Sequence, residues 1–127
     1  MVSARIAAVL LLFASGSAVA GPFDGLQQIA ATRTGSVWYV DRSTLKTDGH
    51  VTSAWLTMDH SRDRTERARR SRALIEIECG AHRYHWVQSF SYRRNGAPLP
   101  EPVRPNVIMD IAAGSPVEAV WQGLCQR

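Results

Sequence analysis

The sequence predicts an α+β domain: an antiparallel sheet of about six strands with one C-terminal helix packed on it and a helix-to-sheet disulfide. Three observations predict this fold. From residue 26 to residue 111 apolar residues mostly recur with the period of two that is typical of strands. From residue 115 the period becomes helical. The two cysteines, Cys79 and Cys125, fall on the faces that these two periods assign to the core.

The first twenty residues have the layout of a secretory signal peptide. Arg5 precedes an apolar run, and the segment ends in the small-residue cleavage pattern Ala18-Val19-Ala20. The run is too short to remain as a membrane span. We therefore expect residues 1–20 to be removed and residues 21–127 to form one domain in an oxidising compartment, where the two cysteines pair. No cysteine follows the expected cleavage site, so we expect no lipid attachment there.

Three strands are expected before the first long loop, and they comprise Leu26–Thr32, Val37–Asp41 and Val51–Asp59. The second is rich in β-branched and aromatic residues, which favour strands. Asp48-Gly49 supplies the positive backbone angles of a two-residue hairpin turn before the third. The third strand alternates, and its expected core face carries Ala54, Leu56 and Met58.

The fourth strand, Ser71–Cys79, has the clearest alternation, with Ala73, Ile75, Ile77 and Cys79 on the expected core face. After a turn at Gly80-Ala81, a fifth strand is expected over His82–Tyr92. Unbroken alternation there places one set of side chains on one face: Tyr84, Trp86, Gln88 and Phe90.

Residues 94–106 hold four prolines, which forbid a central strand and favour an extended loop. A short last strand is expected within Val107–Ile111. Ser115 then begins a helix as its N-cap, with Pro116 in the first turn and Glu118 reaching back in a capping box. The helix carries one apolar stripe, formed by Val117, Val120, Trp121, Leu124 and Cys125.

Arginines are concentrated between the third and fourth strands, where Ser61–Ser71 has little apolar content and predicts a long exposed hairpin loop. Guanidinium groups suit carboxylates, sulfates and phosphates. The candidate partner-binding residues are therefore Arg64, Arg67, Arg69 and Arg70, with a protein or an anionic polymer as the partner. The alternative is an ordinary solvated loop that Asp63 and Glu66 neutralise. The net charge of +4 permits anionic partners without demanding them.

Several sets of residues have the composition of an active site, but their spacing does not predict an active site. His82 and His85 point to opposite faces of a strand, so they cannot chelate a metal there. Adjacent residues such as Asp59-His60-Ser61 cannot form a triad. Glu76 and Glu78 share a face and are expected to pair with arginines of a neighbouring strand. We therefore expect no catalytic residue, no metal and no cofactor; the alternative is a small periplasmic enzyme or metal-binding protein that uses these histidines and glutamates.

The chain resembles the surface-adhesin protein E-like family of Gram-negative bacteria. The resemblance rests on an ordered set of segments: Val37–Asp41 with Ser43-Thr44-Leu45, the strand around Trp55, Ala73–Cys79, and Gly114–Glu118 leading to Cys125. It implies the fold described above and, for some members, adhesion to host extracellular-matrix or serum proteins. The adhesin proper is lipid-anchored, and the missing cysteine here favours a soluble periplasmic or secreted protein. A nucleic-acid partner is not expected, whereas a role as an accessory subunit of an envelope complex stays open.

Overall fold

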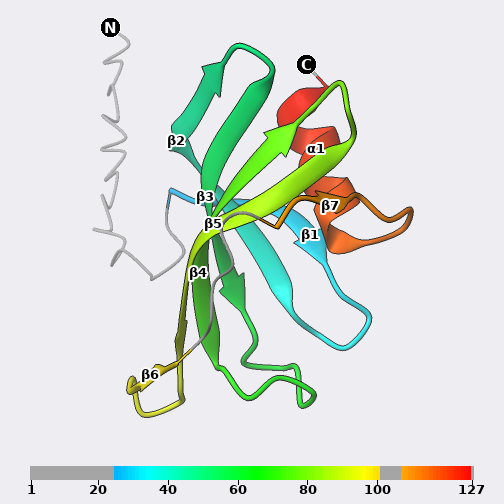
Figure 1. Ribbon diagram of the computed structural model, residues 1–127. Helices are drawn as coiled ribbons and strands as arrows, with labels where there is room; N and C mark the ends of the chain where they lie inside the picture. The colour runs from blue at the N-terminus through cyan, green and yellow to red at the C-terminus, as the bar shows by residue number, and fades with distance from the viewer. Residues whose placement is uncertain (1–24, 101–106, 127) are drawn as a thin grey trace, which may run out of the picture.

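The structure is a computed structural model that describes residues 25–100 and 107–126. The expected signal peptide and residues 101–106 of the proline-rich loop lie outside the described residues. Five long strands follow one another across the sheet in chain order, each antiparallel to the next (Figure 1). They are β1 (Gln27–Ala31), β2 (Val37–Asp48), β3 (Val51–Asp59), β4 (Arg70–Glu78) and β5 (Arg83–Tyr92).

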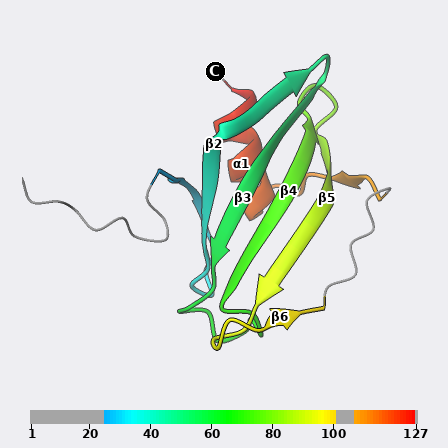
Figure 2. The same cartoon turned by 90° about the vertical axis from the view of Figure 1, so that its left-hand side faces the viewer.

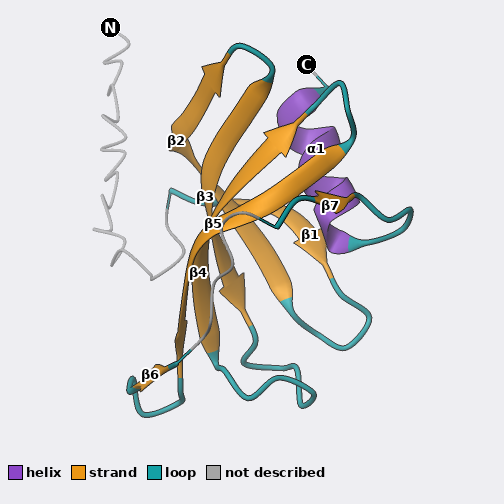
Figure 3. Ribbon diagram, viewed as in Figure 1, coloured by secondary structure: helices purple, strands orange, loops and turns teal. Residues whose placement is uncertain are grey.

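Two strands of two residues each, β6 (Pro98–Leu99) and β7 (Met109–Asp110), pair with opposite ends of β5. The helix α1 (Pro116–Cys125) lies against one face of the sheet (Figure 2). The predicted α+β fold is therefore confirmed (Figure 3). No helix in the described part of the chain is long and apolar enough to cross a membrane.

The core lies between α1 and the facing side of the sheet. The alternation predicted for β3 is confirmed, because every second residue from Thr52 to Met58 is buried. The buried residues of the core are Val40, Ala54, Leu56, Met58, Ala73, Ile75, Ile77, Ile111, Val117, Val120 and Leu124. In the described residues no element covers the other face of the sheet (Figure 2).

The disulfide between Cys79 and Cys125 is present, as predicted from the two periods, and joins the residue after β4 to the last turn of α1. Trp121 supports the same junction: its indole Nε1 donates a hydrogen bond to the carbonyl oxygen of Cys79 at 3.0 Å. The helix end is thus attached to the sheet by one covalent bond and one hydrogen bond.

The start of α1 follows the predicted cap with one difference. The Ser115 side chain accepts a hydrogen bond from the Glu118 backbone N–H at 3.2 Å, as expected of an N-cap. The Glu118 carboxylate, however, accepts from the Gly114 N–H rather than from that of Ser115. The backbone N–H of Ser115 donates to the Ala112 carbonyl oxygen instead.

Replacing the cap residue, Ser115→Ala, is expected to lower the free energy of unfolding by about 1 kcal/mol, as lost N-caps generally do. The reason is that the change removes both hydrogen bonds of the Ser115 hydroxyl, the one accepted from the Glu118 N–H and the one donated to the Ala112 carbonyl oxygen, and leaves the Glu118 N–H with the Ser115 carbonyl oxygen alone. Urea unfolding followed by circular dichroism measures the change, with Ser115→Asp as a variant that restores an acceptor. An unchanged midpoint for Ser115→Ala would show that the cap contributes nothing.

The fifth strand departs from the predicted alternation. The pairing of β4 with β5 shifts between Leu74 and Ile75, so that Val87 is an extra residue on β5. Before this bulge Tyr84 and Trp86 share a face, as predicted, and that face packs against the core. After it the faces exchange, and the prediction for Phe90 is wrong: Phe90 is exposed, whereas its neighbour Ser91 is buried.

The second strand is longer than predicted. It continues past Asp41 to Asp48, with an irregular register between Asp41 and Lys46. Side chains stabilise this irregular segment: the Asp41 carboxylate accepts from the backbone of Ser43, and the hydroxyl of Thr44 accepts from the backbone N–H of Trp55. These polar residues break the alternation, which is why the sequence pattern ended the strand early.

Candidate functional site

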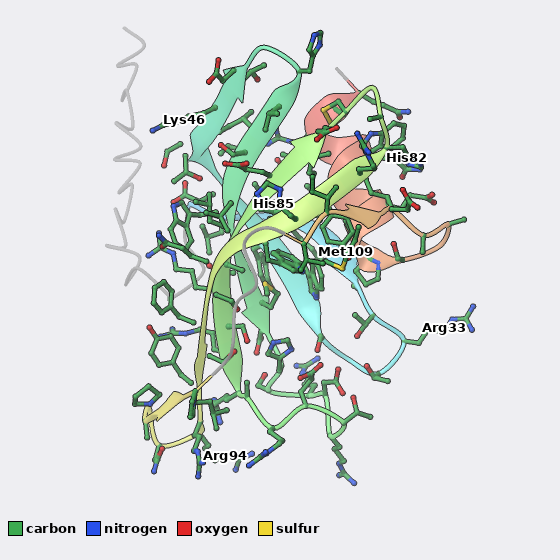
Figure 4. The ribbon with its side chains drawn as sticks, viewed as in Figure 1. Arg33, Lys46, His82, His85, Arg94 and Met109 are labelled. Carbon is green, nitrogen blue, oxygen red and sulfur yellow. A yellow bond between two sulfur atoms is a disulfide. The ribbon has the colours of Figure 1, made fainter. Side chains whose placement is uncertain are left out.

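Exposed arginines gather at one end of the sheet, where the loop between β3 and β4 lies beside the turn between β5 and β6. Figure 4 labels Arg94 at this end. We call this surface the arginine end, and its members are Arg64, Arg67, Arg69, Arg70, Arg93 and Arg94. The first four are the predicted binding residues, and the structure brings them together. The prediction missed Arg93 and Arg94, although antiparallel pairing of β4 with β5 places Arg70 opposite Tyr92.

The arginine end contains two adjacent hollows. The larger has a volume of about 520 Å³, and its lining includes Asp59, Ser61, Arg69, Arg70, Tyr92, Arg93, Arg94 and Gly96. The smaller, of about 210 Å³, shares Arg69 and Arg94 and adds Arg64 and Arg67. Guanidinium groups from two separate stretches of the chain therefore border the same concave surface.

These guanidinium groups have no carboxylate partner in the described residues. The two ion pairs found there, Arg83–Glu78 and His85–Glu76, lie outside the arginine end. Asp59 lines the larger hollow, but its carboxylate accepts the Ser61 N–H at 2.9 Å. Glu66 also borders the smaller hollow, without an ion pair to these arginines in the described residues. Exposed guanidinium groups that have no ion pair can donate paired hydrogen bonds to carboxylate, sulfate or phosphate oxygens.

The loop that carries three of these arginines, Arg64, Arg67 and Arg69, is not wholly exposed, which corrects the sequence prediction. Ala68 is buried, and Asp63 is only 5% exposed. The carboxylate of Asp63 accepts hydrogen bonds from the hydroxyls of Ser36 and Thr34, each at 2.6 Å, and from Thr65. These hydrogen bonds, that of Ser36 foremost, hold the pKa of the Asp63 carboxyl well below its usual range. Asp63 thus anchors the loop instead of neutralising its arginines.

The anchor continues as a buried chain of hydrogen bonds. Ser36 Oγ lies 2.7 Å from His60 Nδ1, His60 Nε2 lies 3.0 Å from Ser71 Oγ, and Ser71 Oγ lies 2.7 Å from Ser91 Oγ. Ser36 has one hydroxyl proton and gives it to the carboxylate of Asp63, so His60 Nδ1 must be the donor to Ser36. We call these five residues the buried polar chain. It joins the β1–β2 turn, the loop, β4 and β5.

A close approach of backbones makes this anchoring possible. Gly35, at φ +113°, lies where an added Cβ would stand 2.8 Å from the carbonyl oxygen of Arg62. Any other residue at this position would push the loop away from the β1–β2 turn. The turn can therefore present Ser36 and Thr34 directly to Asp63.

One group of potential metal ligands occurs in the described residues: ligand atoms of His60, Asp63 and Glu66 lie within 4.8 Å of one another. Both ring nitrogens of His60 and both carboxylate oxygens of Asp63 already have hydrogen-bond partners in the protein. The geometry therefore fits a structural anchor better than a metal centre. His60 is turned into the protein, away from any triad with its neighbours in sequence.

The histidines and glutamates of the alternative interpretation do not converge on one site. Glu78 pairs with Arg83 at 2.9 Å, and Glu76 pairs with His85 at 3.2 Å across the strands. His82 instead contacts Trp121 edge to face, with ring centroids 4.5 Å apart. Figure 4 labels His82 near α1 and His85 along β5. The expected pairing of the glutamates across strands is confirmed, with a histidine in place of one arginine.

A family model described as surface-adhesin protein E matches residues 26–126. Two solved structures of Haemophilus influenzae protein E share the fold. The first, crystal form II, has a TM-score of 0.60 and 13% identity, covering 80% of this chain and 87% of that one. The second has a TM-score of 0.56 and 16% identity, covering 84% and 90%. No curated protein sequence matches the chain.

Proposed function

This chain belongs to the surface-adhesin protein E family, and we propose that it is an exported, non-catalytic binding module whose arginine end holds an anionic partner. The candidate partners are a host extracellular-matrix protein, an envelope protein or an anionic polymer. The compartment we propose is the periplasm of a Gram-negative bacterium or the space outside it. The adhesin family and the disulfide, which oxidising compartments favour, support an exported protein.

The observation that carries the proposal is the set of exposed guanidinium groups around a hollow of about 520 Å³. Within residues 25–100 and 107–126, none of these groups forms an ion pair with a carboxylate. Such a surface attracts anions electrostatically, and added salt shortens the range of this attraction. The buried polar chain holds the loop in place, so fewer backbone degrees of freedom are lost when a partner binds.

The test removes the predicted charges together, as Arg64→Gln, Arg67→Gln, Arg69→Gln and Arg70→Gln. We expect affinity for heparin at low salt to fall by about tenfold for each guanidinium group that no longer binds an anionic group of the ligand. Because these side chains are exposed, each change should alter the stability by no more than about 0.5 kcal/mol. Isothermal titration at two salt concentrations measures the binding, and urea unfolding measures the stability.

A pair of double variants provides the matched control. Arg93→Gln with Arg94→Gln removes two charges from the arginine end, whereas Arg42→Gln with Lys46→Gln removes two from the far half of β2. Figure 4 labels Lys46 and Arg94 at opposite ends of the sheet. Only the first pair should weaken binding. Equal loss from both pairs would mean that heparin responds to net charge alone, and unchanged binding by the quadruple variant would refute the proposal.

A further inference from the structure

The face of the sheet that turns away from α1 carries aromatic side chains next to the arginine end. Phe90 on β5 is 46% exposed. Its ring is nearly parallel to that of Trp55 on β3, with an interplanar angle of 17° and centroids 6.3 Å apart. We call these two rings the aromatic shelf. It exists because the bulge at Val87 turns Phe90 outward.

Arginines on β4 connect the aromatic shelf to the arginine end. Arg72 lies opposite Phe90, with its guanidinium carbon 4.7 Å from the Trp55 ring centroid. Arg70 lies opposite Tyr92, and its guanidinium carbon is 5.9 Å from that ring centroid. Alternate residues of a strand are about 7 Å apart, so Arg72 and Arg70 form a row that leads into the larger hollow, which Arg70 and Tyr92 also line.

An arginine that stacks on an aromatic ring still has N–H groups around the edge of its guanidinium plane. Arg72 and Arg70 can therefore donate to an anion while they pack on Trp55 and Tyr92. The surface thus combines flat apolar rings with a line of cationic donors. A ligand that uses both must itself offer flat apolar faces and anionic groups repeated along its length.

Acidic polysaccharides have both properties, because the C–H faces of pyranose rings stack on aromatic rings and carboxylates or sulfates project from the sugars. An acidic peptide would satisfy the arginines but gains little from a flat shelf. We propose that the aromatic shelf and the arginine end form one surface for a linear acidic polysaccharide, with a sugar on the exposed ring of Phe90, beside the Trp55 ring over which Arg72 lies, and with its anionic groups on Arg72, Arg70 and the hollow. This inference rests on the proposed function and narrows its anionic partner to a glycan.

The experiment compares ligands of similar charge on the full mature protein. The probes are a heparin octasaccharide, an octamer of galacturonic acid, linear polyphosphate and oligothymidylate, each titrated calorimetrically at the same salt concentration. The two sugar probes distinguish sulfate from carboxylate as the recognised group, and binding of either supports the proposal. Polyphosphate has the charge without any ring.

The aromatic shelf is tested by the double variant Trp55→Ala with Phe90→Ala. We expect affinity for the bound sugar probe to fall by about tenfold, the size of effect that removal of a stacking ring has on single-stranded nucleic acids. Affinity for polyphosphate should change by less than twofold. The conservative pair Trp55→Phe with Phe90→Tyr keeps flat rings and should retain sugar binding. Urea unfolding of each variant tests whether the fold is intact. If the alanine pair does not fold, the conservative pair is used for the test instead. Loss of sugar binding by the conservative pair would then refute the proposal.

Three results would overturn the inference. Unchanged sugar binding by the alanine pair would show that the aromatic shelf does not contact the sugar. If the alanine pair lost polyphosphate binding as much as sugar binding, the rings would only position the arginines. Tighter binding of oligothymidylate than of either sugar would make nucleic acid the better ligand. None of these results touches the proposed function, which fails instead if the quadruple arginine variant binds heparin as the unmodified protein does.

Discussion

Removing the disulfide, by Cys79→Ser together with Cys125→Ser, is expected to lower the free energy of unfolding by about 4 kcal/mol. The bond links residues 46 apart in sequence, and a link of that span restricts the unfolded chain by about this amount in the chain-entropy treatment. The folded state also loses its covalent attachment of α1, a helix of ten residues that is too short to be stable alone. Urea unfolding at pH 7 measures the difference.

The control for this prediction is chemical reduction. Dithiothreitol should lower the unfolding midpoint of the unmodified protein to near that of the double variant and leave the variant unchanged. A loss of this size is a large share of the 5–15 kcal/mol that is typical of domains. Two alkylatable thiols in protein purified from the periplasm without reductant would contradict the prediction, as would equal midpoints for both proteins.

Breaking the buried polar chain is expected to have the next largest effect. Ser36→Ala should lower the free energy of unfolding by about 3 kcal/mol, because Ser36 is only 2% exposed and its hydroxyl serves both Asp63 and His60. The change leaves His60 Nδ1 without its partner, and a buried group in that state costs roughly 1–3 kcal/mol. The Asp63 carboxylate loses one hydroxyl donor and keeps those of Thr34 and Thr65. Thr34→Ala is the matched control, since it removes the other hydroxyl donor to the same carboxylate oxygen from an exposed position. It should cost at most about 1 kcal/mol.

The effect of Ser36→Ala should depend on pH in a defined direction. Hydrogen bonds from Ser36, Thr34 and Thr65 lower the pKa of Asp63 in the folded protein, whereas the unfolded chain has a pKa of about 3.9. The stabilisation is therefore fully present above about pH 4 and is lost as the pH falls from there towards the folded pKa. The difference between the two proteins should shrink between pH 4 and pH 2. A constant difference, or one that grows, would contradict this assignment.

Local periodicity was sufficient for the parts of the fold that short segments determine by themselves. The alternation of buried side chains predicted β3, and the capping motif at Ser115 predicted the start of α1. The disulfide followed because two such periods placed Cys79 and Cys125 on facing surfaces. The bulge at Val87 was not predictable in this way, since it is visible only in the pairing of β5 with β4.

Only part of the candidate site was predicted, for a similar reason. Arg64 and its neighbours are conspicuous as a cluster in sequence, whereas Arg93 and Arg94 join them only through strand pairing. The role of Asp63 was missed because its partners on the β1–β2 turn are 27 and 29 residues away. Gly35 permits their approach through its contact with the Arg62 backbone, which only the folded chain brings together.

The bulge at Val87 also affects how this strand should be aligned with its distant relatives. An ungapped alignment that assumes strict alternation would match Phe90 to core positions and Ser91 to surface positions, the reverse of their burial here. A relative without the bulge would need a one-residue gap at this point to bring the two halves of the strand back into phase. At the 13% and 16% identity of the two protein E structures, such a gap in β5 would carry structural information. Substitution patterns before and after the gap should be scored against opposite faces of the sheet.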